Sequence, residues 1–324
     1  MDKNQLIIVT GGAGFIGSSV IRCLNESGIV NIIVVDDLGF SEKWKNLVGT
    51  KFNDIIGKEQ FFSWAKGKES QIGAHIHLGA CSSTVEKNAG YLLENNYRFS
   101  VNLGTYALQN NHRFIYASSA ATYGDGKLGF LDDSTKIDEL HPLNMYGYSK
   151  QLFDLWVKNQ GVQDKLVGLK YFNVFGPNEA HKGRMASAIH HLFPIIKKTG
   201  KVHLFKSDDS NFTHGEQKRD FIYVKDAARM TCAFLNHKAN GIYNIGSGVA
   251  SSWNQLAFAM FKAMNIESHI DYMDMPTDLI GKYQNYTCAD MQKTKALLKD
   301  NANCLSLDSS VADYIQNHLN KLSG

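Results

Sequence analysis

Tyr146 and Lys150 stand four positions apart in the segment Tyr-Gly-Tyr-Ser-Lys. On a helix, residues with this spacing lie on one face, so the hydroxyl and the ammonium can meet the same ligand. A free tyrosine has a pKa near ~10, and we expect the ammonium and a positive nicotinamide ring to lower it. Ser119, which follows a predicted strand, is expected to hydrogen-bond the reacting oxygen. These residues predict acid/base chemistry at a carbinol oxygen coupled to hydride transfer, with Lys150 also holding the ribose of a nicotinamide cofactor.

A second group of titratable side chains lies within residues 172–187. His181, Lys182 and Arg184 follow a Gly-Pro turn and precede an apolar segment with helical spacing. Three interpretations fit these residue types: a solvated loop, a clamp for a phosphorylated ligand, or part of a catalytic apparatus. Spacing alone favours a lysine that neutralises phosphate.

A glycine cluster follows the first apolar run of the chain. The run at 6–10 is typical of a buried parallel strand, and residues 15–24 have helical spacing. Between them, Gly11 permits a tight turn, Gly14 lets a pyrophosphate approach the backbone, and Gly17 lets the helix pack closely on the sheet. The N–H groups at the helix start then face the phosphates. This order of elements predicts a dinucleotide-binding loop.

Asp36 and Asp37 end a second apolar run, about 20 residues beyond the glycines, where an acid normally meets the adenosine ribose. Further strands and helices alternate along the chain, which is typical of a doubly wound parallel sheet. We therefore expect an α/β fold of the Rossmann type with a smaller C-terminal α/β substrate domain. The expected domains are 1–172 with 219–247 for the dinucleotide and 173–218 with 248–324 for the substrate. The further expected elements are strands at 74–78 and 113–117, a strand from Asp220 that returns to the dinucleotide domain, and helices at 90–109, after Asn144, near 252–265 and near 307–320.

Composition and charge exclude several classes of protein. The chain has 324 residues, of which 44% are hydrophobic and 20% charged, and its formal net charge is +3. It has no Lys/Arg run suited to a nucleic-acid backbone and no apolar stretch near the ~20 residues that span a bilayer. Scattered cysteines and an N-terminus without a signal-peptide pattern predict a cytoplasmic location and no metal site. His75 and His77 alternate along one strand and are interpreted as core histidines rather than metal ligands.

Several segments resemble the extended short-chain dehydrogenase/reductases, which include nucleotide-sugar epimerases, dehydratases and decarboxylases. The general ones are Thr-Gly-Gly-Ala-Gly-Phe-Ile-Gly near the N-terminus, Tyr-x-x-x-Lys, and Ala-Ser-Ser-Ala-Ala-Thr-Tyr-Gly at 117–124. More specific ones are His-Leu-Gly-Ala-Cys-Ser-Ser-Thr (77–84), Asn-Asn-Tyr (95–97), Gly-Pro-x-x-x-His-Lys-Gly-x-Met-Ala-Ser (176–187) and Lys-Arg-Asp-Phe-Ile-Tyr-Val (218–224). Over essentially the whole chain, these segments resemble the ADP-L-glycero-D-manno-heptose 6-epimerase family.

The resemblance implies an isomerase that inverts C6 of the heptose in ADP-D-glycero-D-manno-heptose, for lipopolysaccharide inner-core precursor synthesis, with bound NADP and a carbonyl intermediate. Tyr146 and Lys182 match the family's catalytic pair, with Ser119 and Lys150 beside them, although Lys182 as a phosphate contact stays open from the residues alone. The resemblance also implies a homopentamer. It assigns cofactor contacts to Gly11, Gly14, Phe15, Ile16, Gly17, Asp36, Asp37, Lys43, Lys58, Leu78, Gly79, Ala80, Cys81, Ser82, Asn95, Lys150, Val174 and Lys182, and substrate contacts to Ser119, Asn173, Arg184, His191, Phe205, Arg219 and Tyr283.

Three features near the expected ligands depart from the family pattern. Leu78 stands where the family usually has an acid, and Arg184 replaces a small hydroxyl residue. Arg184 is expected to depress the proton affinity of Lys182 by like-charge repulsion, or to grip a more anionic ligand. A polar insert at 208–217 follows Phe205 where the family has a short nucleotide-facing loop.

The choice between the two nicotinamide cofactors rests on charge. The carboxylates of Asp36 and Asp37 repel the 2′-phosphate of NADP, whereas the ammonium groups of Lys43 and Lys58 offset that repulsion. We expect NADP, with NAD as the alternative.

Two other functions stay open from the sequence. Another nucleotide-sugar epimerase, such as a UDP-sugar 4-epimerase, shares these motifs. A cofactor-binding sensor without turnover uses the same fold, although such a protein does not need Ser119, Tyr146 and Lys150 together. A dehydratase is disfavoured because Ala120 and Ala121 stand where those enzymes carry an Asp-Glu pair.

Overall fold

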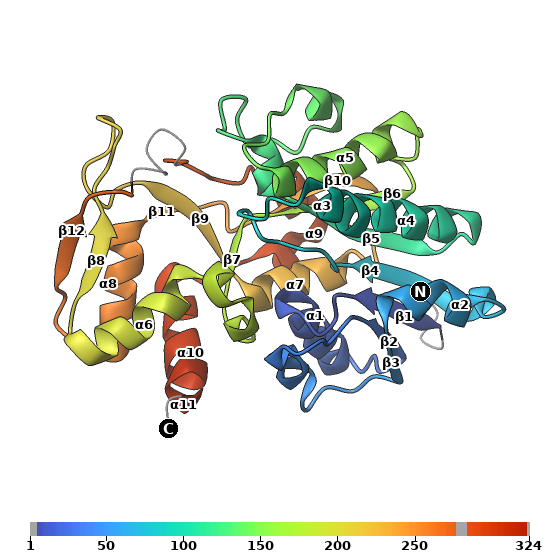
Figure 1. Cartoon of the computed structure of the whole chain (residues 1–324), viewed down its shortest axis with the longest axis horizontal. Helices are drawn as coiled ribbons and strands as arrows, with labels where there is room; N and C mark the ends of the chain where they lie inside the picture. The colour runs from blue at the N-terminus through green and yellow to red at the C-terminus, as the bar shows by residue number, and fades with distance from the viewer. Residues whose placement is uncertain (1–4, 277–283, 323–324) are drawn as a thin grey trace.

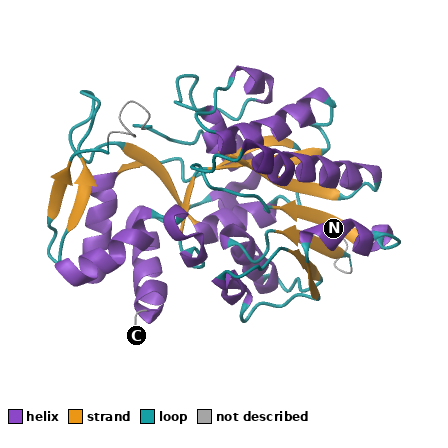
Figure 2. Cartoon of the chain, viewed as in Figure 1, coloured by secondary structure: helices purple, strands orange, loops and turns teal. Residues whose placement is uncertain are grey.

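A seven-stranded parallel sheet organises the N-terminal part of the chain (Figures 1 and 2). The computed structural model describes residues 5–276 and 284–322. The strand order is β10-β6-β5-β4-β1-β2-β3, so the direction of winding reverses beside β1. This order confirms the predicted doubly wound fold, in which ligands bind where the winding reverses. The strands are β1 (Leu6–Thr10), β2 (Ile32–Val35), β3 (Asp54–Ile56), β4 (Ile72–His77), β5 (Arg113–Ser119), β6 (Leu166–Tyr171) and β10 (Gly241–Ile245).

Strand β1 shows why these segments are apolar throughout. Successive side chains point to opposite faces of a strand. Ile7 and Val9 belong to the core on one face of the sheet, whereas Ile8 belongs to the core on the other. Both faces are covered by helices, as an all-parallel sheet requires. Helices α1 (Phe15–Glu26), α7 (Val224–Ala233) and α9 (Gln292–Leu298) cover the first face, and α2 (Phe61–Ala65), α4 (Phe99–Gln109) and α5 (Met145–Asn159) cover the second.

A separate hydrophobic core lies at the other end of the molecule, on the left of Figure 1. Helix α8 (Trp253–Met264) runs through it and begins at a capping box, in which Ser252 Oγ accepts from Gln255 N and Gln255 Oε1 accepts from Ser252 N. None of the helices within the described ranges is long and apolar enough to cross a membrane. The other elements of this end are β7 (Asn173–Phe175), α6 (Ala188–Thr199), β8 (Val202–Phe205), β9 (Lys218–Tyr223), β11 (Ala250–Ser252), β12 (Ile270–Met273), α10 (Leu307–Tyr314) and α11 (Asn320–Leu322).

Most predicted elements are confirmed to within a few residues, with one error of placement. The predicted helix at 90–109 is α3 (Ala89–Leu92), a π-helical stretch (Leu93–Arg98) and then α4. The strand expected from Asp220 is β9, which begins two residues earlier and does not join the large sheet. It pairs instead with β7 and β11 in a three-stranded sheet. The local sequence predicts that a strand forms, but the strands with which it pairs depend on contacts between residues distant in sequence.

A buried carboxylate joins α5 to β5 beneath the end of the sheet where β5 terminates. Asp154 Oδ1 accepts from Tyr116 Oη at 3.0 Å, and its Oδ2 accepts from Ser118 Oγ at 2.7 Å. Lys170 Nζ lies 3.6 Å from the same Oδ2 and donates to Thr122 Oγ1 at 2.6 Å. The Asp154 and Lys170 side chains are 0% and 2% exposed, so each charge depends on the other.

Replacing Asp154 with asparagine tests this dependence. Asp154→Asn leaves the Lys170 ammonium buried without its carboxylate, and we expect the free energy of unfolding to fall by about 3–5 kcal/mol. The double variant Asp154→Asn/Lys170→Met removes both charges and is expected to recover most of that loss. Urea unfolding measures both values, and equal losses in the single and double variants would contradict the ion pair.

Candidate active site

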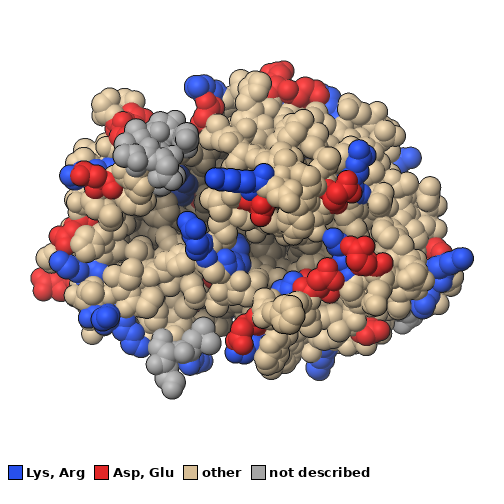
Figure 3. Space-filling model, in the orientation of Figure 1, with Lys and Arg blue, Asp and Glu red and all other residues tan. Residues whose placement is uncertain are grey.

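A cavity of about 780 Å³ opens at the carboxyl ends of β1, β4, β5 and β6. Its wall also includes Ile189 and Leu256, which belong to the second core, so it lies between the two ends of the molecule. Figure 3 shows the face that is hollowed at its centre, with lysine or arginine side chains at the border of the hollow. A cavity at this position is where a doubly wound fold places its ligands.

The glycine loop after β1 forms one wall of the cavity, and its glycines present main-chain atoms without side chains. Gly11 has a φ of +66°, and a Cβ added to it would lie 2.7 Å from Gly79 Cα. A Cβ at Gly14 would lie 3.0 Å from Gly11 O, and one at Gly17 would lie 2.1 Å from the same oxygen. At these three positions the neighbouring backbone leaves no room for a side chain, so only glycine fits, and the first turn of α1 stays open. This cradle fits the pyrophosphate of a dinucleotide.

Asp36 forms bonds within the protein beside the glycine loop. Its Oδ2 accepts from Ala13 N in the glycine loop at 2.9 Å, and its Oδ1 lies 2.6 Å from Lys43 Nζ. Both Asp36 and Lys43 line the cavity. Asp37 is exposed and accepts from Lys58 N at 3.3 Å, outside the lining formed by the described residues. Of the two adjacent acids, Asp36 therefore belongs to the cavity wall and Asp37 lies outside it.

The loop after β4 is held by Asn96, a residue that the sequence analysis did not single out. Asn96 is 1% exposed, and its Oδ1 accepts from Cys81 N at 2.9 Å. Its Nδ2 donates to Cys81 O and to Ser149 Oγ on α5. These bonds tie the predicted cofactor loop to the helix that carries Tyr146. The neighbouring Asn95 accepts from Lys58 Nζ at 3.0 Å.

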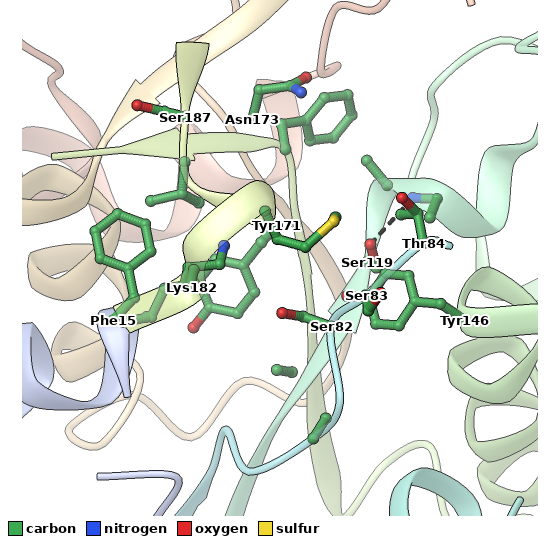
Figure 4. A pocket seen from close by; sticks show the side chains of 18 of the residues that line it. Phe15, Ser82, Ser83, Thr84, Ser119, Tyr146, Tyr171, Asn173, Lys182 and Ser187 are labelled. Carbon is green, nitrogen blue, oxygen red and sulfur yellow. Dashed lines mark hydrogen bonds between the residues drawn. The ribbon is translucent and has the colours of Figure 1, made fainter. Parts of the chain in front are cut away.

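Ser119, Tyr146 and Lys150 lie together in the cavity wall, as the spacing predicted. The Tyr146 hydroxyl is hydrogen-bonded to Ser119, and Ser119 Oγ accepts from Ala121 N at 3.1 Å. Lys150 Nζ donates to Ala117 O at 2.8 Å. Figure 4 shows Tyr146 and Ser119 side by side. The group is suited to proton transfer at a ligand oxygen, because a hydroxyl donor and a phenol converge on one point.

Burial sets the proton affinities of this group. It lowers the pKa of Lys150 to about 8, and the carboxylate of Asp154 one turn along the helix opposes this effect. Burial raises the pKa of Tyr146, and the hydrogen bond from Ser119 partly offsets the rise. The expectation that Lys150 lowers the pKa of Tyr146 is therefore wrong for the protein alone. The spacing of the two residues does not reveal that the ammonium is turned to the carbonyl of Ala117.

Lys182 faces this group from the other side of the cavity, next to Phe15 (Figure 4). Its Nζ lies 5.3 Å from the centre of the Phe15 ring. Burial lowers the pKa of Lys182, and the carboxylate of Glu179 opposes that change. The expected influence of Arg184 on this pKa is wrong, because Arg184 is exposed and lies outside the lining formed by the described residues. Lys182 and Tyr146 thus belong to opposite walls.

His181 connects the Lys182 segment to the glycine loop. His181 lines the cavity, and its Nδ1 lies 3.1 Å from Asn46 Nδ2. Asn46 Nδ2 also donates to Ala13 O at 2.9 Å. Burial lowers the pKa of His181, and the ammonium of Lys43 acts in the same direction. A neutral His181 accepts from Asn46 and needs no counter-ion.

Comparison with known proteins agrees with this geometry. The model of the NAD dependent epimerase/dehydratase family matches residues 7–246. The ADP-L-glycero-D-manno-heptose-6-epimerase of Nitratidesulfovibrio vulgaris is 47% identical over 321 residues, which are 97% of this chain and 98% of the relative. The protein of the same name from Fusobacterium nucleatum is 44% identical over 328 residues and 98% of each chain. The chain belongs to the ADP-L-glycero-D-manno-heptose-6-epimerase family.

Solved structures agree with this family assignment. The ADP-L-glycero-D-manno-heptose-6-epimerase of Helicobacter pylori has a TM-score of 0.82 at 28% identity, over 98% of each chain. A UDP-N-acetylglucosamine 4-epimerase from Methanobrevibacter ruminantium has a TM-score of 0.81 at 22% identity, over 98% of this chain and 99% of that one, and shows the fold alone. A UDP-glucuronic acid 4-epimerase from Bacillus cereus, with a TM-score of 0.77 at 24% identity over 97% and 99%, binds NAD. The chain is an epimerase of a nicotinamide-dependent family.

The cavity of this epimerase brings together most, but not all, of the predicted site residues. Tyr283 lies outside the described residues. Arg219 is 7% exposed, and its guanidinium lies 5.9 Å from the ring centre of Trp253, which does line the cavity. The predicted residues within the lining are Gly11, Gly14, Phe15, Ile16, Gly17, Asp36, Lys43, Leu78, Gly79, Ala80, Cys81, Ser82, Ser119, Tyr146, Lys150, Asn173, Val174 and Lys182. Those outside the lining formed by the described residues are Asp37, Lys58, Asn95, Arg184, His191, Phe205 and Arg219.

The insert at 208–217 packs against the start of α8. Asn254 Nδ2 donates to His214 O at 3.0 Å and to Glu216 Oε1 at 2.7 Å. Trp253 N donates to Gln217 O at 3.3 Å. The insert therefore lies beside the end of the cavity that contains Trp253 and away from Tyr146.

The two histidines of β4 are part of the core, as predicted. His75 Nε2 lies 3.0 Å from His112 Nδ1, and His77 Nε2 lies 2.8 Å from Ser100 Oγ. Burial keeps the pKa of both imidazoles below the ordinary value. Within residues 5–276 and 284–322, no three His, Cys, Asp or Glu side chains gather in a way that would hold a metal ion.

A methyl group at Gly17 tests the cradle. Because the new Cβ would lie 2.1 Å from Gly11 O, Gly17→Ala must displace the glycine loop, and we expect the affinity for NAD(P) to fall at least tenfold. Titration calorimetry with the cofactor measures this change. Gly90→Ala is the control and should bind normally. Gly90 also lies at the start of a helix, but its new Cβ would lie 3.5 Å from the nearest atom, Asn88 Oδ1. Equal affinities for the two variants would exclude the close approach.

Proposed function

We propose that this protein inverts C6 of the heptose in ADP-D-glycero-D-manno-heptose to give ADP-L-glycero-D-manno-heptose, a step of lipopolysaccharide inner-core precursor synthesis. The observation that carries the proposal is the placement of two proton-transfer groups, Tyr146 and Lys182, on opposite walls of one cavity (Figure 4). Relatives of nearly equal length bear the name of this activity. Inversion through a carbonyl requires hydride to leave one face of the carbon and return to the other.

Each wall supplies a proton-transfer group for one orientation of the sugar. The glycine loop and Lys150 would hold a nicotinamide cofactor, which would supply the hydride chemistry at C6. In one orientation Tyr146 takes or returns the proton of the C6 hydroxyl, and Ser119 donates a hydrogen bond to the reacting oxygen. After the sugar turns to present its other face, Lys182 performs the same exchange. A positive nicotinamide ring beside Tyr146 would favour its phenolate, whereas the Lys150 ammonium, whose pKa burial lowers to about 8, is bonded to Ala117 O.

The cavity wall disfavours elimination of water. Ala120 and Ala121 line the cavity directly after Ser119, and their methyl groups can neither donate nor accept a proton. A UDP-sugar 4-epimerase would use the same Tyr146 group, so the base of the nucleotide separates the two epimerases. A non-catalytic sensor would bind cofactor without turning over either sugar.

We propose that the resident cofactor is NADP. Asp36 is paired with Lys43 and bonded to Ala13 N, so its charge is offset where a 2′-phosphate would lie. The Lys58 ammonium is bonded to Asn95, outside the lining formed by the described residues. NAD is the alternative. Chromatography of the nucleotide released by denaturing the purified protein identifies the cofactor directly.

Replacing Lys43 probes this charge balance. Lys43→Ala removes the partner of Asp36, and we expect the affinity for NADP to fall about tenfold while that for NAD changes less. Lys45→Ala, which changes an exposed lysine on the same 3₁₀ turn (Glu42–Leu47), is the matched control. Calorimetric titrations with both cofactors give the ratio. A larger loss for NAD than for NADP would reverse the assignment.

Organisation beyond the site is also part of the proposal. The two hydrophobic cores support most of the division into residues 1–172 with 219–247 and 173–218 with 248–324. Two elements depart from it: β9, which the division gives to the first domain, pairs with β7 and β11 of the second, and α9 of the second packs on the large sheet. A homopentamer is proposed from the family resemblance, and a cytoplasmic location from the scattered cysteines. Light scattering after gel filtration tests the first, and fractionation of cells tests the second.

Conversion of ADP-D-glycero-D-manno-heptose, followed by NMR of the C6 proton, tests the reaction. We expect Tyr146→Phe and Lys182→Met to lower kcat by about 10²–10⁴-fold, because each removes a proton-transfer group for one face. Tyr148→Phe on the same helix and Lys198→Met on α6 are exposed controls that should keep full activity. Full activity of Lys182→Met would leave Lys182 as a phosphate contact. Inversion of a UDP-sugar instead would favour the other epimerase.

A further inference from the structure

One buried carboxylate closes the segment that carries Lys182. Glu179 is 1% exposed and lies between β7 and α6. Its Oε2 accepts from Ser187 N at 2.6 Å, and its Oε1 accepts from Ser187 Oγ at 2.6 Å and from Gly176 N at 3.4 Å. Gly176 and Ser187 are the two ends of the segment. The carboxylate therefore fastens both ends to one point.

Lys182 lies in the middle of this closed segment. Its backbone N–H donates to Glu179 O at 2.9 Å, which forms the first turn after the carboxylate residue. The next residue, Gly183, has a φ of +52° and interrupts the 3₁₀ turn (Ala180–Met185). The direction of the Lys182 side chain, above the Phe15 ring, thus depends on a turn that begins at Glu179.

Helix α10 contacts the same carboxylate. Tyr314 on α10 is 2% exposed, and its hydroxyl is hydrogen-bonded to Glu179 and lies 3.4 Å from His190 Nδ1. Helix α10 packs against α8 in the second core. The position of the Glu179 carboxylate is therefore fixed by an element more than a hundred residues away.

Charges around Lys182 leave Glu179 as the carboxylate that acts on it. Burial lowers the pKa of Lys182, and the negative charge of Glu179 raises it. Asp36 is paired with Lys43 on the far side of His181, and Arg184 is exposed. The other titratable groups near the pair are Tyr314 and His190 beside Glu179, and His181, Lys43 and Asp36 on the side of Lys182. Arg184 belongs to the same 3₁₀ turn as Lys182 but is exposed.

We propose that Glu179 is a positioning residue for Lys182: its carboxylate closes the segment that aims Lys182 into the cavity and supplies the negative charge that holds the ammonium there. Only the kinetic consequence rests on the proposed epimerase reaction. The competing explanation is a structural one, in which Glu179 merely supports Ser187, the N-cap of α6. That explanation involves the same hydrogen bonds but no charge on Lys182.

Titration of Lys182 separates the two explanations without any substrate. The holoenzyme is labelled with ¹³C-lysine, and the Lys182 signal is identified by its loss in Lys182→Met. Glu179→Gln keeps the shape but removes the charge, and we expect the titration midpoint of Lys182 to move down by about one pH unit. The direction follows because the carboxylate favours the charged ammonium. Ser187→Ala removes one hydrogen bond and keeps the carboxylate, so its midpoint should stay within a few tenths of a unit. An unchanged midpoint in Glu179→Gln would overturn the proposal.

The pH profile of kcat gives the kinetic counterpart. In Glu179→Gln, the limb that depends on Lys182 should move to lower pH by the same amount, and kcat should fall by about 10–100-fold with a smaller change in KM. A structural role would instead change the melting temperature and leave the limb in place. If no variant or wild-type protein turns over ADP-heptose, the proposed function fails, whereas the NMR titration still decides the role of Glu179.

Glu179→Asp keeps the experiment decisive if Glu179→Gln does not fold. The shorter side chain retains the charge but withdraws it by one methylene from Ser187 and Gly176. We expect the Lys182 midpoint to stay near that of the wild type, while kcat falls because the segment is no longer closed at both ends. Wild-type kcat in Glu179→Asp would exclude the positioning role.

Discussion

A carboxylate stays charged inside a protein only where hydrogen-bond donors or cations replace the water that it loses. Three such carboxylates hold the loops around the cavity of this epimerase. Asp154 joins α5 to β5, and Glu179 closes the segment that carries Lys182. Asp220, which is 0% exposed, accepts from Ala289 N and from both Ser247 N and Oγ, so it ties β9 to the turn after β10. Asp154 thus fixes a helix to a strand, whereas Glu179 and Asp220 fix loop residues to buried carboxylates.

This arrangement has a direct consequence for a reaction that uses two walls. Tyr146 and Lys182 belong to different secondary-structure elements. The distance between their side chains therefore depends on how the two hydrophobic cores pack together. In the proposed reaction, a sugar that turns within the cavity would gain from proton-transfer groups that stay in place while it moves. Burial also brings the pKa of Lys150 to about 8 and lowers that of Lys182, which moves both ammonium groups toward the pH range where they exchange protons.

The sequence predicts those parts of the site whose members are close together in the chain. The glycine loop and the Tyr146–Lys150 pair needed only short spacings, and the structure places them in one cavity. Asn96 and Glu179 were missed because their partners are distant or are backbone atoms, which no side-chain pattern reveals. For the protein without cofactor, the direction of the Tyr146 pKa differs from the prediction for a related reason: spacing shows which charges are near, but burial depends on the assembled fold. The predicted sheet partners of β9 were wrong for the same reason, because strand pairing also depends on the assembled fold.

The three departures from the family pattern differ in how they relate to the cavity. Arg184 is exposed outside the lining formed by the described residues, and the insert at 208–217 is bonded to Asn254 at the start of α8. Leu78 does line the cavity, but it follows β4 on the cofactor side. Arg184 belongs to the same 3₁₀ turn as Lys182, whereas α5, which carries Tyr146, contains none of the three changes. In the proposed reaction, chemistry at the carbinol carbon depends on the walls that carry Tyr146 and Lys182, whereas recognition of the rest of the ligand depends on the rim.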